Sequence, residues 1–193
     1  MADFRVRAAL AADAPAIDGV HRAAFPADLE ARLVALLTER GKAVVSLVAE
    51  EAEQVVGHIL FSPATVGPIS RTGPGSGNSL SLGGSGSARQ AEPTGLGLAP
   101  VAVLPSFQHR GIGSALIRAG LAECLRLAAP WVVVLGHEAY YPRFGFAPAS
   151  RWNLTCDYGV SDAFQFLPLT DAASATHGGR VSYAPEFAEI FPE

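Results

Sequence analysis

The residues with the clearest chemical potential are two glycines at the start of a predicted helix. Gly111 and Gly113 follow the apolar segment Val101–Leu104, from which Pro105–Arg110 separate them. The first turn of a helix leaves backbone N–H groups unpaired and carries partial positive charge, so it can hold a diphosphate without charged side chains. Because glycine has no Cβ, the diphosphate can approach closely. The spacing therefore indicates a phosphate site.

Two common phosphate-binding motifs can be compared with this segment. In the dinucleotide-binding fold, Glu138 would lie about where the ribose-binding acid is expected. However, the first glycine of that motif follows the strand at once, and its third glycine position is occupied here by Leu116. A P-loop is excluded because the sequence contains no Gly-Lys-Ser or Gly-Lys-Thr. Neither motif accounts for the segment.

The elements that must position these glycines can be predicted from periodicity and from turn residues. Alternating or continuous apolar runs predict strands at 4–8, 44–50, 55–62, 96–104, 131–135, 164–169 and 180–183. Helical spacing predicts helices at 13–25, from Ala27 or Asp28 to Gly41, at 113–128 and at 139–144. The apolar stripe of the third of these consists of Ile117, Leu121, Cys124, Leu125 and Ala128. A strand, a helix and a buried strand in succession predict a parallel crossover.

One segment departs from this pattern. Between Gly67 and Gly95, 8 of the residues are Gly, 6 are Ser and 3 are Pro. Such a composition buries too little apolar area to offset its conformational entropy, so we expect a mobile insertion. A functional lid is the alternative, and a surface insertion between two strands is favoured over it.

Composition limits the classes of protein. The 193 residues suit one domain, and the hydrophobic fraction of 49% suits a globular core. A net charge of −4 with scattered basic residues disfavours nucleic acid as a partner. The sequence shows neither a signal peptide nor a membrane span, and its two cysteines are far apart. We expect a cytoplasmic protein with free thiols, no metal site and no membrane partner, as a monomer or homodimer.

The glycine segment resembles a known family when it is taken with its neighbours. Gln108–Gly113, after Val101–Pro105, is similar to the acetyl-coenzyme A motif of GNAT N-acetyltransferases. Gly57–Pro63, Val134–Gly136 and Tyr140–Phe146 resemble the YhbS-like branch of that family. The resemblance implies an α/β GNAT acyltransferase fold, with a mixed central β-sheet splayed at the motif and flanked by helices. One such domain would span 1–193, with the insertion at 67–95.

The resemblance also implies roles for particular residues. The cofactor-binding positions would be Val101, Ala102, Val103, Gln108, His109, Arg110, Gly111, Ile112, Gly113 and Ser114. A backbone N–H near Ala102 or Val103 would face the thioester carbonyl. Tyr141, four residues before Gly145, would be the general acid that protonates the leaving thiolate, with Tyr140 as the fallback.

A general base is harder to place. The segment 96–103 is entirely apolar, where many members of the family carry a glutamate. His137 and Glu138, after the next strand, are the nearest titratable candidates by sequence. The base is therefore left open.

The resemblance implies an N-acetyltransferase that moves an acetyl group from acetyl-CoA to a primary amine. The acceptor, a small molecule or a protein, would be bound by residues 14–40 and 150–183, which carry no recognisable motif. The alternative is a coenzyme A-binding sensor or partner-binding module that has kept the fold without turnover.

Overall fold

A computed structural model describes residues 4–68, 94–159, 162–175 and 178–191. The strands are β1 (Phe4–Ala8), β2 (Val45–Glu51), β3 (Gln54–Gly67), β4 (Thr94–Val103), β5 (Trp131–Leu135), β6 (Ala147–Pro148), β7 (Leu154–Cys156), β8 (Phe164–Pro168) and β9 (Gly179–Tyr183). The α-helices are α1 (Ala14–Ala24), α2 (Leu29–Glu39), α3 (Ile112–Arg126), α4 (Asp171–Ser174) and α5 (Glu186–Ile190). Within these residues, no helix is long and apolar enough to cross a membrane.

The strands form one mixed sheet in the order β1-β2-β3-β4-β5-β8-β6. Along this order, neighbouring strands are antiparallel except β4 and β5, which run parallel because α3 connects them as a crossover. β9 pairs with the far end of β3, and β7 pairs with β9 in parallel. This confirms the predicted mixed sheet, including its parallel pair.

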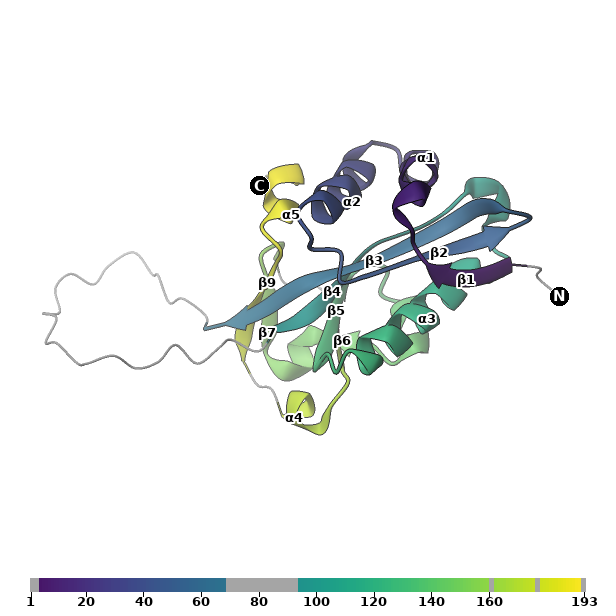
Figure 1. Cartoon of the computed structure of the whole chain (residues 1–193). Helices are drawn as coiled ribbons and strands as arrows, with labels where there is room; N and C mark the ends of the chain where they lie inside the picture. The colour runs from purple at the N-terminus through teal and green to yellow at the C-terminus, as the bar shows by residue number, and fades with distance from the viewer. Residues whose placement is uncertain (1–3, 69–93, 160–161, 176–177, 192–193) are drawn as a thin grey trace, which may run out of the picture.

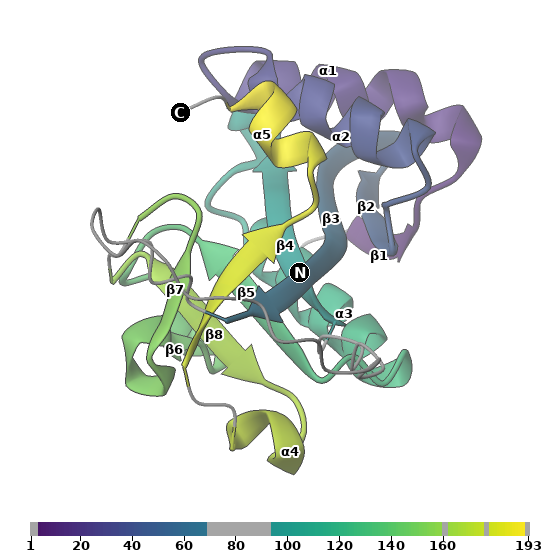
Figure 2. The ribbon, with the colours of Figure 1, turned by 90° about the vertical axis from the view of Figure 1, so that its left-hand side faces the viewer.

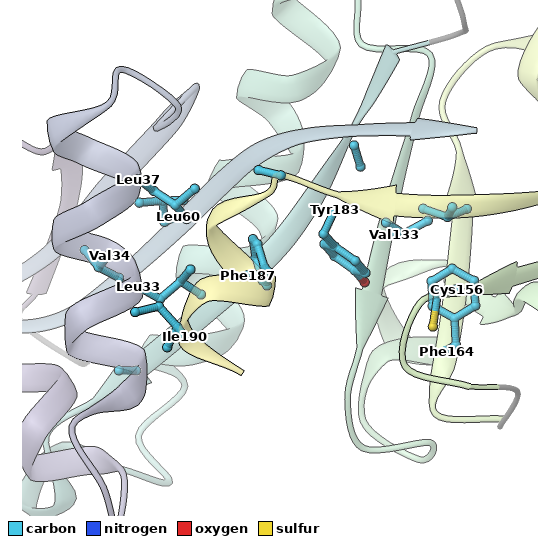
Figure 3. Packing of buried hydrophobic residues seen from close by; sticks show 14 of the residues in the cluster. Leu33, Val34, Leu37, Leu60, Val133, Cys156, Phe164, Tyr183, Phe187 and Ile190 are labelled. Atoms are coloured by element: carbon cyan, nitrogen blue, oxygen red, sulfur yellow. The ribbon is translucent and has the colours of Figure 1, made fainter. Parts of the chain in front are cut away.

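Helices cover both faces of the sheet. Figures 1 and 2 show α1, α2 and α5 on one face and α3 on the other. Alternate residues of a strand therefore enter different cores: Val133 of β5 packs toward α1 and α2, while Val132 and Val134 pack toward α3. Figure 3 shows the first core, where Leu33 of α2 and Ile190 of α5 approach each other.

Local sequence explains where several of these elements end. The β2–β3 hairpin turns at Ala52 and Glu53, which both have positive φ, so its two-residue loop has the twist that adjacent strands need. Helix α1 is capped by Phe25, which directly precedes Pro26. Helix α2 is followed by Gly41, which has a φ of +66°. These stops are where the sequence predicts them.

Two predictions need correction, and two short strands were not predicted. Leu125 is 55% exposed and Ala128 follows the end of α3, so the buried stripe of that helix instead begins earlier, with Ile112 and Leu116. The expected helix at 139–144 is a short 3₁₀ turn, Tyr141–Phe144. The strands β6, which pairs with β8, and β7, which pairs with β9, were not predicted. Short strands of two or three residues carry too little periodicity to be recognised.

The low-complexity segment is shorter than composition suggests. β3 continues to Gly67 and β4 begins at Thr94, with Ala64 paired to Gly95. The strand needs a glycine at position 95 because the Trp131 ring occupies the place of a side chain there: an added Cβ would be 2.2 Å from that ring. The rest of the predicted insertion, residues 69–93, lies outside the described residues.

Candidate active site

The start of α3 presents the backbone N–H groups that the glycine spacing predicts. Gly111 caps the helix in the left-handed conformation, with φ of +85°. The first intrahelical hydrogen bond runs from Ala115 N to Gly111 O at 3.0 Å. The N–H groups of Ile112, Gly113 and Ser114 therefore precede the helical ladder and point out from its positive end.

Strand β4 supplies a second row of donors next to this turn. Its pairing with β5 ends at Leu98, opposite Val134, although β4 continues to Val103. The sheet is thus splayed between these strands, as expected. Leu104 N donates to Val56 O of β3, so alternation along the strand directs the N–H of Val103 away from β3 and toward the opening.

A cavity of about 580 Å³, which we call the motif cavity, joins the two features. Its lining comprises Val101, Ala102, Val103, Phe107, Gln108, His109, Gly111, Ile112, Gly113, Ser114, Tyr140 and Arg143. Nine of the ten predicted cofactor-binding residues are in this set. Phe107 and Arg143 were not predicted: Phe107 directly precedes the motif Gln108–Gly113, and Arg143 lies in the segment Tyr140–Phe146, of which only the tyrosines were given a role.

A second cavity, of about 460 Å³, lies on the other side of the opening, and we call it the apolar cavity. Its lining comprises Phe25, Glu30, Leu33, Leu98, Ala99, Pro100, Val101, Leu135, Gly136, Tyr141, Tyr158, Tyr183, Phe187 and Phe191. Val101 lines both cavities, so they meet where β4 separates from β5.

Tyr140 and Tyr141 face different cavities. The Tyr140 hydroxyl lies 3.4 Å from Ser114 Oγ at the motif cavity, and Arg143 stacks over its ring at 4.6 Å. Tyr141 lines the apolar cavity and is only 8% exposed. An added Cβ at Gly136 would lie 2.4 Å from Tyr141 Cε2, so this glycine makes room for the ring. Burial raises the pKa of Tyr141 to about 12, which keeps its hydroxyl protonated at neutral pH.

This arrangement agrees with comparisons to known proteins. A family model described as an acetyltransferase (GNAT) domain matches residues 42–148. The chain is 34% identical over 184 residues to the uncharacterized N-acetyltransferase YhbS of Escherichia coli K12, covering 94% of this chain and 97% of the relative. The chain belongs to the GNAT acetyltransferase family. The resemblance in the sequence is thereby confirmed.

Solved structures of GNAT proteins share the fold over nearly the whole chain. The crystal structure of Escherichia coli YhbS in complex with CoA has a TM-score of 0.80 and 32% identity, covering 96% of this chain and 92% of that one. A GNAT acetyltransferase from Brucella melitensis in complex with acetyl-CoA has a TM-score of 0.71 and 32% identity, covering 95% and 97%.

Arg110 is the GNAT motif residue that does not line the motif cavity. Its guanidinium donates to Glu51 Oε1 at 2.7 Å and lies over the Phe107 ring at 5.2 Å. These contacts tie the motif turn to the β2–β3 hairpin. Arg110 therefore positions the turn, whereas His109, with φ of +61°, lines the cavity itself.

Neither of the two candidates for a general base lines a cavity of the candidate site. His137 and Glu138 are exposed in the turn after β5 and line neither of them. The His137 carbonyl accepts a hydrogen bond from Tyr140 N at 3.0 Å, so this turn orients the tyrosines through its backbone. Across the described part of the chain, no three His, Cys, Asp or Glu residues gather as a metal site would require, and Cys124 and Cys156 are free.

Proposed function

We propose that this chain transfers the acetyl group of acetyl-CoA to a primary amine by direct attack within a ternary complex. The observation that carries the proposal is the meeting of the two cavities at Val101. One cavity carries the unpaired N–H groups of a helix N-terminus, and the other is apolar and contains the buried Tyr141. A thioester placed between them is accessible to an amine from the second cavity.

The residues of the motif cavity fit coenzyme A. The N–H groups before Ala115 and the partial positive charge of the 15-residue α3 suit a pyrophosphate. Open space surrounds the Cα of Gly111, with no atom within 4 Å of an added Cβ. The relatives solved with CoA and with acetyl-CoA support this assignment.

The proposed chemistry needs one donor to the carbonyl and one proton for the sulfur. The N–H of Val103 faces the opening and donates to the thioester oxygen as negative charge develops on it. The Tyr141 hydroxyl donates a proton to the departing thiolate as the C–S bond breaks, and its raised pKa keeps that proton available. The phenolate then regains the proton that the attacking nitrogen loses as the amide forms.

The amine must also be neutral when it attacks. An alkylammonium group has a pKa of about 10.4 in water. Transfer into the apolar cavity disfavours the charged form, so burial lowers the pKa of the amine and promotes loss of its proton. Because His137 and Glu138 line neither cavity, we assign neither as the base.

Calorimetric titration with CoA tests the cofactor assignment. Gly111→Glu places negative charge beside the pyrophosphate and should weaken CoA binding about a hundredfold or more. Gly111→Ala is the matched control, because it introduces the same strain at positive φ without charge and should retain most of the affinity. Near-unchanged affinity in a folded Gly111→Glu protein would contradict the assignment.

Thiol release from acetyl-CoA with a panel of amines tests the reaction itself. Turnover with at least one primary amine, with the acetyl group recovered on its nitrogen, is the expected result. Tight CoA binding without turnover across a broad panel would instead support the sensor or binding module.

A further inference from the structure

The lining of the apolar cavity is rich in aromatic side chains. Six of its residues are aromatic: Phe25, Tyr141, Tyr158, Tyr183, Phe187 and Phe191. The rings of Tyr183 and Phe187 lie 5.0 Å apart between centroids, and Figure 3 shows them side by side where β9 meets α5. At about 460 Å³, the cavity falls within the range of about 300–1,000 Å³ typical of small-molecule sites.

Two of the rings occupy space that only a glycine leaves open. An added Cβ at Gly97 would lie 2.7 Å from the Tyr183 ring, as one at Gly136 would crowd Tyr141. Both glycines lie on the paired part of the sheet or directly after it. Two of the six aromatic walls, Tyr183 and Tyr141, are therefore packed against β4 and the end of β5.

Glu30 is the one carboxylate among the described residues that line this cavity. It lies in the first turn of α2, one turn before Leu33, which lines the same cavity. It has no ion-pair or hydrogen-bond partner in the described part of the chain, whereas Glu50, Glu51 and Glu189 all bind arginines. Its half-buried side chain keeps contact with solvent.

No positive charge balances this carboxylate within the described lining, which contains neither Lys nor Arg. Burial raises the pKa of Tyr141 to about 12 and that of Tyr183 well above its usual value, so both hydroxyls are neutral at pH 7. The net charge of the described lining is thus that of Glu30. A ligand carboxylate would find no cationic partner there and would be repelled by Glu30.

We infer that the apolar cavity selects small primary amines that carry an aromatic or aliphatic body and no carboxylate, with Glu30 drawing their ammonium form in from solvent. This inference rests on the proposed function, because it takes this cavity as the acceptor site. Glu30, in contact with solvent, attracts the ammonium form, and the amine loses its proton to solvent as the aromatic walls bury it. α-Amino acids and polyamines are disfavoured, the former by their carboxylate and the latter by the burial of a second charge.

A matched pair of amines tests the inference. 2-Phenylethylamine and L-phenylalanine share the same body and differ by the carboxylate. Calorimetry on the CoA-bound protein, which cannot react, should show 2-phenylethylamine binding at least about tenfold more tightly. L-Phenylalanine amide, which lacks the negative charge, should recover much of that affinity.

Variants of Glu30 test the source of the selectivity. Glu30→Gln should weaken 2-phenylethylamine binding about three- to tenfold and narrow its advantage over L-phenylalanine, with CoA affinity unchanged. Glu30→Asp keeps the charge and should retain most of the selectivity. Glu39→Gln, an equal charge change at an exposed position of α2 outside the lining, should alter neither.

Three results would overturn the inference. One is binding of L-phenylalanine or spermidine as tight as that of 2-phenylethylamine. Another is unchanged selectivity in folded Glu30→Gln. The third is faster reaction with hexanoyl-CoA than with acetyl-CoA, because the cavity would then receive the acyl chain.

Binding and turnover separate this inference from the proposed function. Selective binding of 2-phenylethylamine without acetylation of any amine supports the cavity assignment and contradicts the transferase. Acetylation confined to carboxylated amines supports the transferase and contradicts the cavity assignment.

Discussion

Tyr140 and Tyr141 are neighbours in the chain, yet their side chains enter different cavities. The ring of Tyr141 fits against Gly136, and that of Tyr140 reaches Ser114 at the start of α3. The 3₁₀ turn that begins at Tyr141 produces this divergence. At the residue scale, the two hydroxyls therefore have separable roles in the proposed reaction.

Tyr141→Phe should lower kcat about tenfold or more and leave CoA affinity unchanged. Phenylalanine keeps the ring packing but removes the proton, and general acids contribute about 10²- to 10⁴-fold, with a good leaving group such as a thiolate at the low end. The deficit should shrink at high pH, where the thiolate leaves without protonation. Steady-state rates across pH, with an acceptor identified by thiol release, measure this.

Tyr140→Phe is the matched control for that measurement and should retain most of kcat. Full kcat in Tyr141→Phe together with loss in Tyr140→Phe would assign the acid to Tyr140. Full activity in both would remove the tyrosines from the chemistry.

Among the elements, the packing of α3 on the sheet depends on a glycine. Gly120 lies on the buried face of α3, and an added Cβ would lie 2.4 Å from Phe61 Cε2 on β3. Helix propensity alone would favour alanine at this position by about 1 kcal/mol. The close approach of the helix to the strand opposes that preference.

Gly120→Ala should destabilise the protein by about 1–3 kcal/mol, because the Phe61 ring or the helix must shift. Gly19→Ala, in α1 with no atom within 4 Å of an added Cβ, should instead stabilise it by about 0.5–1 kcal/mol. Urea unfolding of both variants checks the prediction. A stabilised Gly120→Ala would show that the ring yields at no cost.

The connection between β3 and β4 is the other element with a testable property. Thr65 and Thr94 are paired across the two strands, so a short turn can join their ends. Replacing residues 69–93 with such a turn should leave the unfolding midpoint and CoA affinity nearly unchanged, since loop length contributes only weakly to stability. Loss of folding, or of CoA binding in a folded protein, would show that the segment contributes to structure or to the site.

For the molecule as a whole, a buried histidine pair links α1 to the sheet. His21 Nε2 lies 2.8 Å from His58 Nδ1, and His58 Nε2 lies 2.9 Å from Ser46 Oγ. Burial lowers the pKa of His21 to about 4, and burial together with repulsion from His21 lowers that of His58 to about 3. Both rings are therefore neutral in the folded protein at pH 5, whereas the unfolded chain binds protons below about 6.5.

Stability should fall on acidification from pH 7.5 to pH 5. At pH 5, about 1.5 units below the pKa of a histidine in the unfolded chain, protonation of the unfolded chain lowers the free energy of unfolding by about 2 kcal/mol for each histidine. Urea unfolding at the two pH values should thus differ by several kcal/mol. His58→Gln should reduce the difference, while His137→Gln, at an exposed turn, should not. An equal pH dependence in His58→Gln and the wild type would contradict the linkage.

Much of the fold is determined locally and is therefore readable from the sequence. The strands from Phe4 to Ala8 and from Trp131 to Leu135 match their predicted bounds, because alternating or continuous apolar side chains specify them. The GNAT motif could be located because the turn before α3 needs Gly111, whose φ of +85° few other residues adopt. Nine of the ten cofactor positions implied by the resemblance line one cavity, because they are close together in the sequence on one strand and the turn after it.

Tertiary structure decided what depends on contacts between distant segments. Arg110 turns away from the motif cavity because Glu51, 59 residues earlier, accepts its hydrogen bond. His137 and Glu138, close to the tyrosines in sequence, are exposed and line neither cavity. Glu30 belongs to no recognisable sequence motif. It lines the apolar cavity only because α2 packs beside α5 on the same face of the sheet (Figures 1 and 2). Charge, burial and access at a site depend on such packing, and no single stretch of sequence encodes them.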